Sequence, residues 1–328
     1  MQPFYCPLDD GKAMCIRPDI METDEILEFP EYSKEQSIYL GIRNTIIALW
    51  NINPNEWLTP KRCERFLICR GLVRVLVVRE AQRILTFLTH KGVVNYGILH
   101  IPPHCRMRRF ETLRVAVVGA GVSGLSAAQH LQNLGAEVTV LEAKDVIGGR
   151  ICDDFSLGVA FGLGGQLITG VINNPFCVMC IQAGIPFRTL NDECPLLDET
   201  DGEIVPTLID KRIDFHFNAM LDAVEYWRNK STDDIALETA LTTMHRLFLK
   251  QSGVMLSAAE QRLLNFHLSN LEYSCGSPLR QVSAMHWDQN EKFAQFAGKH
   301  ALLPDGCSII VDKLSCGINV IKSCAVNF

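Results

Sequence analysis

Apolar and polar positions follow two different periods within residues 114–141, and the change of period predicts the local elements. Residues 115–118 are a short run of valine and alanine typical of a buried strand, and residues 137–141 form a second strand-like run. Between them, apolar residues recur at the spacing of a helix face over residues 123–133. Gly135 can end this helix in a left-handed conformation. The stretch therefore predicts one strand–helix–strand unit.

Elsewhere the hydrophobic pattern is mostly helical. Residues 1–32 are rich in proline and acidic residues and are predicted to be extended, whereas residues 33–99 have helical periodicity. Thr59 followed by Pro60 is typical of a helix start. Residues 308–314 are expected at the edge between a strand and a helix. A second helical block is predicted, with helices over residues 213–227, 235–250 and 258–271.

Three glycines stand where the first strand meets its helix, with the spacing G-x-G-x-x-G. Gly119 permits a tight turn, Gly121 lets the backbone approach a pyrophosphate, and Gly124 lets helix and strand pack closely. The N-terminus of the helix offers N–H groups and partial positive charge to phosphates. Glu142, at the end of the second strand, lies where an acidic residue binds ribose hydroxyls. The context predicts a dinucleotide site, and the alternative is an ordinary turn with incidental glycines.

Cysteine usage and hydropathy narrow the class of protein. Thirteen cysteines have no framework spacing, which fits a reducing compartment, and no apolar run has the length of a membrane span. Cys177 and Cys180 form a lone C-x-x-C motif. We expect them to be buried helix cysteines rather than half of a zinc site or a redox pair, and we predict no metal site.

The net charge of −6 is unevenly distributed. Residues 1–100 contain equal numbers of basic and acidic residues, so the excess of acid lies in the remainder of the chain. An acidic surface there would suit a basic partner, although charge alone fits a solvated surface equally well. Residues 61–83 carry seven basic and two acidic side chains. This cluster fits a weak DNA contact, but a solvated helix face is the favoured interpretation because the region between the charges is mostly apolar.

Two resemblances divide the chain. Residues 1–100 resemble a SWIRM domain with an extended N-terminal segment, a helical module of chromatin proteins, and residues 101–112 are expected to be a linker. The run Glu142–Arg150 resembles the continuation seen in flavoprotein amine oxidases, where the Gly-Gly-Arg turn lies beside the FAD pyrophosphate. The run Gly162–Gly170 resembles the segment of that family that passes close to the flavin. The resemblance therefore implies FAD rather than NAD.

The implied fold is an incomplete α/β amine oxidase fold, Rossmann-like, behind an all-α SWIRM domain. Residues 113–190 would form the FAD-binding part, residues 191–293 a helical substrate-binding lobe, and residues 294–328 the start of the return to the FAD-binding part. The residues expected to contact FAD are Val118, Gly119, Gly121, Val122, Ser123, Gly124, Leu141, Glu142, Ala143, Lys144, Gly148, Gly149, Arg150, Gly165, Gln166, Leu167 and Ile168.

The pairing of SWIRM with an amine oxidase fold resembles the flavin-dependent lysine-specific histone demethylases. The runs Ile209–Asn218, His267–Tyr273 and His286–Gln289 are similar to segments of that family. No heptad insertion follows Trp227, so the chain resembles the second branch, which lacks an inserted coiled coil. We expect the family's catalytic lysine, and the rest of the flavin domain, to lie beyond the end of this chain, which is then expected to be inactive alone.

The resemblance implies FAD-dependent demethylation of mono- and dimethyl-lysine at the fourth position of the histone H3 tail, with release of formaldehyde and hydrogen peroxide. It also implies a nuclear location, nucleosome binding and a chromatin reader protein as partner. The residues expected to bind the tail are His216, Asn270, Glu272, Asp288 and Glu291. Two alternatives are a catalytically inactive chromatin-binding module and a general amine or polyamine oxidase, and the SWIRM domain argues against the latter.

Overall fold

The computed structural model describes residues 1–6, 13–105, 110–191, 193–289 and 293–327. The chain forms two compact units. The first unit combines Met1–Asp192 with Ala294–Phe328, and the second is Glu193–Phe293. Among the described residues, no helix has both the length and the hydropathy needed to cross a membrane.

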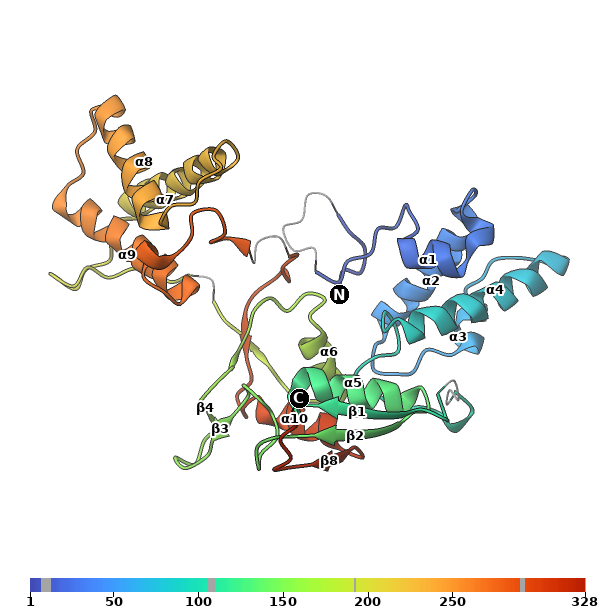
Figure 1. Ribbon diagram of the computed structural model, residues 1–328. Helices are drawn as coiled ribbons and strands as arrows, with labels where there is room; N and C mark the ends of the chain where they lie inside the picture. The colour runs from blue at the N-terminus through green and yellow to red at the C-terminus, as the bar shows by residue number, and fades with distance from the viewer. Residues whose placement is uncertain (7–12, 106–109, 192, 290–292, 328) are drawn as a thin grey trace. The chain divides into compact units, whose positions relative to one another are not determined.

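The N-terminal part of the first unit is helical (Figure 1). Its α-helices are α1 (Thr23–Glu28), α2 (Ser37–Ile52), α3 (Pro60–Glu64) and α4 (Gly71–His90). Tyr39, Ile46 and Trp50 of α2 are buried in one core with Ile84 and Leu88 of α4. The helix start predicted at Thr59 is confirmed, because its hydroxyl accepts a hydrogen bond from the N–H of Arg62 in α3.

The prediction that residues 1–32 are extended is wrong at α1. Glu22 and Glu25 form a reciprocal capping box around the first turn of this helix. Glu25 is also buried against Arg43 of α2, with 2.7 Å between Glu25 Oε2 and Arg43 Nη1, and both side chains are at most 1% exposed. The proline and acidic residues suggested an extended segment, but this carboxylate has an arginine partner eighteen residues away.

The part of the first unit that follows residue 110 contains a parallel sheet in the order β1-β2-β8 (Figure 1). Its strands are β1 (Arg114–Val118), β2 (Glu137–Leu141) and β8 (Asn319–Ile321). Helix α5 (Val122–Asn133) joins β1 to β2, which pair from Arg114 opposite Glu137 to Val118 opposite Leu141. A parallel pair needs such a crossover, so the predicted strand–helix–strand unit is confirmed. Gly135, just after α5, has a φ of +100°.

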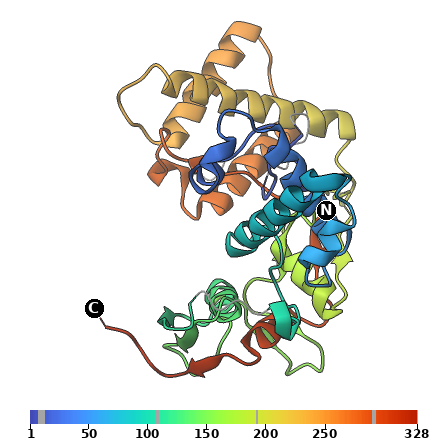
Figure 2. The same cartoon turned by 90° about the vertical axis from the view of Figure 1, so that its right-hand side faces the viewer.

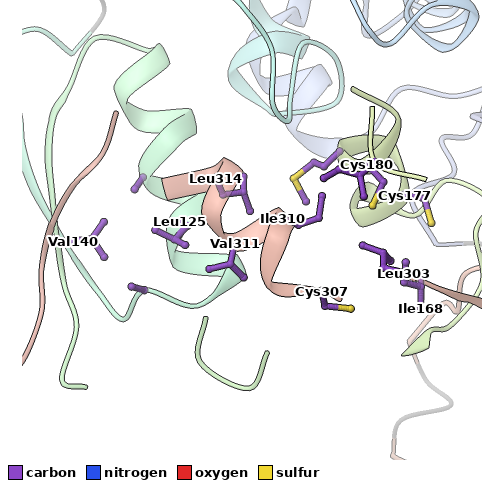
Figure 3. Packing of buried hydrophobic residues seen from close by; sticks show 14 of the residues in the cluster. Leu125, Val140, Ile168, Cys177, Cys180, Leu303, Cys307, Ile310, Val311 and Leu314 are labelled. Carbon is purple, nitrogen blue, oxygen red and sulfur yellow. The ribbon is translucent and has the colours of Figure 1, made fainter. Parts of the chain in front are cut away.

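Helices α6 (Pro175–Ala183) and α10 (Ser308–Ser315) share a core with α5 and β2. Figure 3 shows Leu125 and Val140 on one side of this core and Ile310, Val311 and Leu314 of α10 beside them. The prediction of a strand–helix edge at residues 308–314 is wrong, because the three apolar residues of α10 have helical spacing and are all buried. The strand β8 begins only at Asn319.

Cys177 and Cys180 lie on α6 and are buried in the same core (Figure 3). Burial raises the pKa of Cys177 to about 11 and that of Cys180 to about 12, so both thiols are protonated at neutral pH. The described part of the chain contains no group of three or more side chains that could hold a metal ion. The interpretation of this motif as buried helix cysteines is therefore confirmed.

Short strands extend the first unit beyond the parallel sheet. One sheet has the order β5-β7-β6, and β3 pairs with β4 in a second, antiparallel one. Because β7 lies between β5 and β6, the segment after residue 294 is joined to the chain before residue 190. The bounds are β3 (Asp153–Asp154), β4 (Phe161–Gly162), β5 (Leu167–Ile168), β6 (Arg188–Thr189) and β7 (Ala301–Leu302).

Gln182 of α6 links the two parts of the first unit. Its side-chain Oε1 accepts a hydrogen bond from the N–H of Ile98 at 2.8 Å. Its Nε2 donates to the carbonyl oxygens of Pro54 and Tyr96 at 2.8 and 3.0 Å. One amide therefore holds three backbone groups of the N-terminal helical part.

The second unit is a helical lobe built from α7 (Thr207–Arg228), α8 (Leu237–Ser252) and α9 (Ala258–Cys275) (Figures 1 and 2). Their shared core includes Ile213, Met220 and Val224 of α7 with Leu241 of α8 and Leu264 of α9. The three predicted helices are confirmed, although α7 begins six residues earlier than residue 213.

Candidate flavin-binding site

The turn between β1 and α5 requires glycine at two positions. Gly119 has a φ of +99°, a left-handed conformation that favours glycine. A Cβ atom at Gly124 would lie only 2.0 Å from the carbonyl oxygen of Gly119. Gly124 therefore allows the first turn of α5 to press against the end of β1, as the sequence predicted. The turn is closed by packing that no larger residue permits.

A second glycine pair lies directly against this turn. Gly121 and Gly148 form a parallel bridge, and the N–H of Gly148 donates to the carbonyl oxygen of Ala120 at 2.9 Å. Gly148 has a φ of +114° and Gly149 one of +64°. A Cβ atom at Gly149 would lie 3.4 Å from the Cα atom of Gly121. The two glycine pairs thus form a surface of bare backbone that an extended diphosphate can approach closely.

The N-terminus of α5 opens at this surface. Gly121 is the N-cap residue, and no side chain caps the helix. The first intrahelical hydrogen bond runs from the N–H of Leu125 to the carbonyl oxygen of Gly121 at 2.9 Å. The first turn contains no acidic residue. The N–H groups at the start of α5 and the helix dipole therefore favour an anionic ligand here.

Glu142 is fixed by the same loops. Its Oε2 accepts a hydrogen bond from the N–H of Ala120 at 2.7 Å, and its Oε1 accepts one from the N–H of Lys144 at 2.9 Å. The hydrogen bonds from Lys144 and Ala120 lower the pKa of the Glu142 carboxyl, and its residue is only 8% exposed. A carboxylate can accept about four hydrogen bonds, so lone pairs remain for ribose hydroxyls.

The Gly-Gly-Arg turn and the later glycine run meet through the backbone. The N–H of Gly165 donates to the carbonyl oxygen of Arg150 at 3.0 Å, and a Cβ atom at Gly164 would lie 2.1 Å from that oxygen. The Arg150 side chain is exposed. Two segments that the sequence assigned separately to the cofactor are therefore neighbours, with one cation beside them.

The other predicted cofactor residues differ in how they can serve. Ile168 is buried in the core. Val118 and Leu167 are 60% and 47% exposed. Gly119, Gly121, Gly124, Gly148 and Gly149 make the bare surface. The remaining residues border these loops, namely Val122, Ser123, Leu141, Ala143, Lys144 and Gln166. That the whole set contacts FAD stays a prediction.

The predicted tail-binding residues lie in the second unit, and three of them have partners there. Asp288 Oδ1 lies 2.5 Å from Arg228 Nη1, and both side chains are largely buried. Glu272 Oε1 accepts a hydrogen bond from the N–H of Leu279 at 2.9 Å. Asn270 is exposed on α9. Glu291 lies outside the described residues.

His216, the fifth of these residues, is buried between α7 and α8. Its Nε2 lies 2.9 Å from Nδ1 of His245, and its ring is 4.6 Å from that of Phe248, measured between centroids. Burial lowers the pKa of His216, with a further contribution from His245, and burial lowers the pKa of His245. Neutral rings suit a packing role for His216, and its role in binding a tail stays a prediction.

Comparison with known protein families decides which kind of dinucleotide protein this is. A model of flavin-containing amine oxidoreductases matches residues 122–319, and a SWIRM model matches residues 13–96. A model of pyridine nucleotide-disulphide oxidoreductases matches residues 79–156.

The chain belongs to the flavin-containing amine oxidoreductases.

Curated relatives of this amine oxidoreductase are histone demethylases. It is 51% identical to lysine-specific histone demethylase 1B of Mus musculus and 49% identical to lysine-specific histone demethylase 2 of Homo sapiens. Each match covers 97% of this chain and 39% of the relative. The 1B homolog of Caenorhabditis elegans is 41% identical, over 99% of this chain and 41% of that protein. The predicted resemblance to this group, and the SWIRM and amine oxidase folds, are confirmed.

Among solved structures, wild-type putrescine oxidase bound to putrescine matches with a TM-score of 0.44 and 20% identity, over 64% of this chain and 51% of that one. This chain spans about two fifths of the length of the curated relatives that it matches.

The cofactor of this family is FAD, and the residues of the turn fit it. The close backbone approach at Gly121 and the uncapped start of α5 suit a diphosphate, and the ionised Glu142 suits a ribose. These three features are present in the chain without a bound ligand. The FAD prediction is confirmed for the family.

Asp153, which the sequence did not predict as a site residue, fixes a helix next to these loops. Asp153 Oδ2 accepts a hydrogen bond from the N–H of Ser308, at the start of α10, at 2.7 Å. A Cβ atom at Gly306 would lie 2.4 Å from the same oxygen. The carboxylate thus fixes α10 against the chain that follows the Gly-Gly-Arg turn. Its partner lies 155 residues away, so local spacing gives no signal for it.

Proposed function

We propose that this amine oxidoreductase acts in chromatin as a demethylase of mono- and dimethyl-lysine at the fourth position of the histone H3 tail. The observation that carries the proposal is near 50% identity to lysine-specific histone demethylases across both the SWIRM and the oxidase regions. A nuclear location and binding to the H3 tail within nucleosomes follow from the same proposal.

The proposed reaction uses the loops around the glycine turn for cofactor binding. FAD, when bound, supplies the electron acceptor for oxidation of the N-methyl carbon. The start of α5 and Arg150 would offset the diphosphate charge, and Glu142 would hold the ribose of the adenosine. Water then hydrolyses the substrate imine to the shortened amine and formaldehyde, and dioxygen is reduced to hydrogen peroxide. A trimethylated lysine lacks the nitrogen lone pair that this route requires.

Substrate binding is proposed for the helical second unit. Its exposed Asn270 and the acidic residues Glu272, Asp288 and Glu291 are of the kind that a basic tail requires. Because Asp288 is paired with Arg228, a tail arginine would have to share or replace that partner. The catalytic lysine of the family is not assigned to any residue of this chain.

The test measures flavin and demethylation separately. The purified chain is examined for a flavin absorption band and then incubated with H3 peptides carrying mono-, di- or trimethyl-lysine at the fourth position. For this chain joined to the part of a curated relative that it does not match, we expect peptide mass loss and peroxide release with the first two peptides only. Gly41→Ala, whose Cβ would meet nothing within 4 Å, serves as a control.

The outcomes separate the alternatives. A chain that binds flavin and oxidises polyamines but not H3 peptides would support a general amine oxidase. A chain that binds nucleosomes without flavin or demethylation would support an inactive chromatin-binding module. We expect FAD binding by this chain alone to be weak.

A further inference from the structure

The first half of α4 and the loop before it expose a group of apolar side chains. Ile68 is 99% exposed, Leu72 is 86% exposed, and four neighbours are more than half exposed. We define the α4 patch as Phe66, Ile68, Leu72, Val73, Val75 and Leu76. Contiguous exposed apolar surface of this kind is rare on soluble domains unless a partner covers it.

Helical spacing organises this patch. Leu72, Val75 and Leu76 stand at positions i, i+3 and i+4 of α4, so they lie on one face. The second half of the same helix behaves differently, because Ala81, Ile84, Leu85 and Leu88 are buried in the SWIRM core. In Figure 1 the first turns of α4 project past α2. The helix is thus anchored by one end and presents an apolar face at the other.

Basic side chains surround the α4 patch. Residues 61–79 contain six basic residues and one acidic residue, in a chain whose net charge is −6. Arg62 pairs with Glu56, and Arg74 donates to the carbonyl oxygens of Leu67 and Glu64. We define the basic rim as the exposed Lys61, Arg65, Arg70 and Arg79. Within the described ranges, these four side chains form no ion pair.

We infer that the α4 patch docks an amphipathic helix of a partner protein, with an apolar stripe on the patch and acidic residues against the basic rim. Amphipathic helices commonly bind a hydrophobic surface of another protein through their apolar face. A nucleic acid would need the cations but would leave six apolar side chains without a role. A second copy of this chain would place the two basic rims against each other, and like charges would oppose that contact.

The test uses the full chain and two designed helical peptides that share one leucine stripe. One peptide carries glutamate on its other positions and the second carries lysine. Binding is measured by fluorescence anisotropy of labelled peptide. We expect the glutamate peptide to bind and the lysine peptide to bind at least roughly tenfold more weakly.

Two variants locate the contact. Leu72→Ser/Leu76→Ser removes the centre of the stripe, and we expect the affinity for the glutamate peptide to fall by roughly tenfold or more. Leu208→Ser, at an 82% exposed leucine in the second unit, is the matched control and should leave the affinity unchanged. Thermal unfolding checks that both variants remain folded, as expected for exposed positions.

Three results would overturn the inference. Equal binding of the two peptides would remove the role of the basic rim. The chain could instead bind a DNA duplex tightly, with binding lost in Arg70→Gln/Arg79→Gln but kept in the serine variant. That result would make the segment a phosphate-binding surface. A concentration-dependent dimer that Leu72→Ser dissociates would assign the patch to a second copy.

Discussion

The SWIRM helices and the flavin turn each hold a buried carboxylate, and the two carboxylates have different partners. Glu25 meets the guanidinium of Arg43 at 2.7 Å, whereas Glu142 is held by the backbone N–H groups of Ala120 and Lys144. The first pair joins two helices. The second set of contacts shapes two loops and leaves acceptor capacity for a ligand. The same side-chain type therefore supports packing in one region and a binding surface in the other.

The largest expected effect comes from breaking the packed pair. Arg43→Met leaves the Glu25 carboxylate buried without its cation, and we expect a loss of about 3–5 kcal/mol in the free energy of unfolding. The double variant Glu25→Met/Arg43→Met should recover part of that loss. Denaturant unfolding measures both, with Arg83→Ala, at an exposed pair with Glu31, as a control that changes stability by less than about 1 kcal/mol.

The next effect tests whether the flavin turn depends on bare backbone. Gly124→Ala places a Cβ atom 2.0 Å from the Gly119 carbonyl oxygen, so β1 and α5 must move apart. We expect FAD affinity to fall by roughly 10- to 100-fold, the equivalent of a modest packing clash. Isothermal titration with FAD is the measurement. Unchanged affinity in this variant, with Gly41→Ala as control, would contradict the assignment of the turn.

A smaller effect is expected from the carboxylate of the turn. Glu142→Gln keeps the shape but replaces an ionised acceptor of two N–H groups, and FAD affinity should fall by roughly tenfold. Because these hydrogen bonds lower the pKa of Glu142 in the folded protein, its contribution to the free energy of unfolding is present above the usual value of 4.5 and is lost as pH falls through the lowered pKa. The Gln variant should lose this acid-side dependence, which denaturant unfolding across that pH range measures.

The smallest effect concerns a buried pair without charge. Burial lowers the pKa of both His216 and His245, so the unfolded chain takes up protons more readily below the usual value of 6.5. Stability of the second unit should therefore fall as pH drops below that value, by on the order of a few degrees in Tm. His216→Gln/His245→Phe should flatten this dependence, and His286→Gln, at an exposed ring, should not. Hydrogen exchange in α7 and α8 locates the change.

The sequence predicted those features whose cause is local. The glycine spacing at residues 119–124, the strand from Glu137 to Leu141 and the helix start at Thr59 all depend on neighbours within a few residues, and the structure contains them. Local spacing also predicted Glu142 as a site residue. Its hydrogen bond from the N–H of Ala120 could be seen only in the structure.

The features that the sequence did not predict depend on distant partners. Helix α1 was missed because Glu25 is buried only through Arg43. The partner of Asp288 was not predicted, because nothing in the sequence indicates that Arg228 lies 2.5 Å away. The role of Asp153 at the start of α10 has the same cause, a partner 155 residues along the chain. Composition alone predicts that such charged residues are exposed, because their partners become neighbours only in the folded chain.

Gln182 makes the SWIRM and oxidase regions poor candidates for interchange between relatives. Its amide fits the carbonyl oxygens of Pro54 and Tyr96 and the N–H of Ile98, and a Cβ atom at Gly97 would lie 2.2 Å from its Oε1. A SWIRM sequence transplanted from another protein would have to reproduce that loop path and a glycine at the same point. A chimera that ignores this match would retain both folded parts and lose the joint between them.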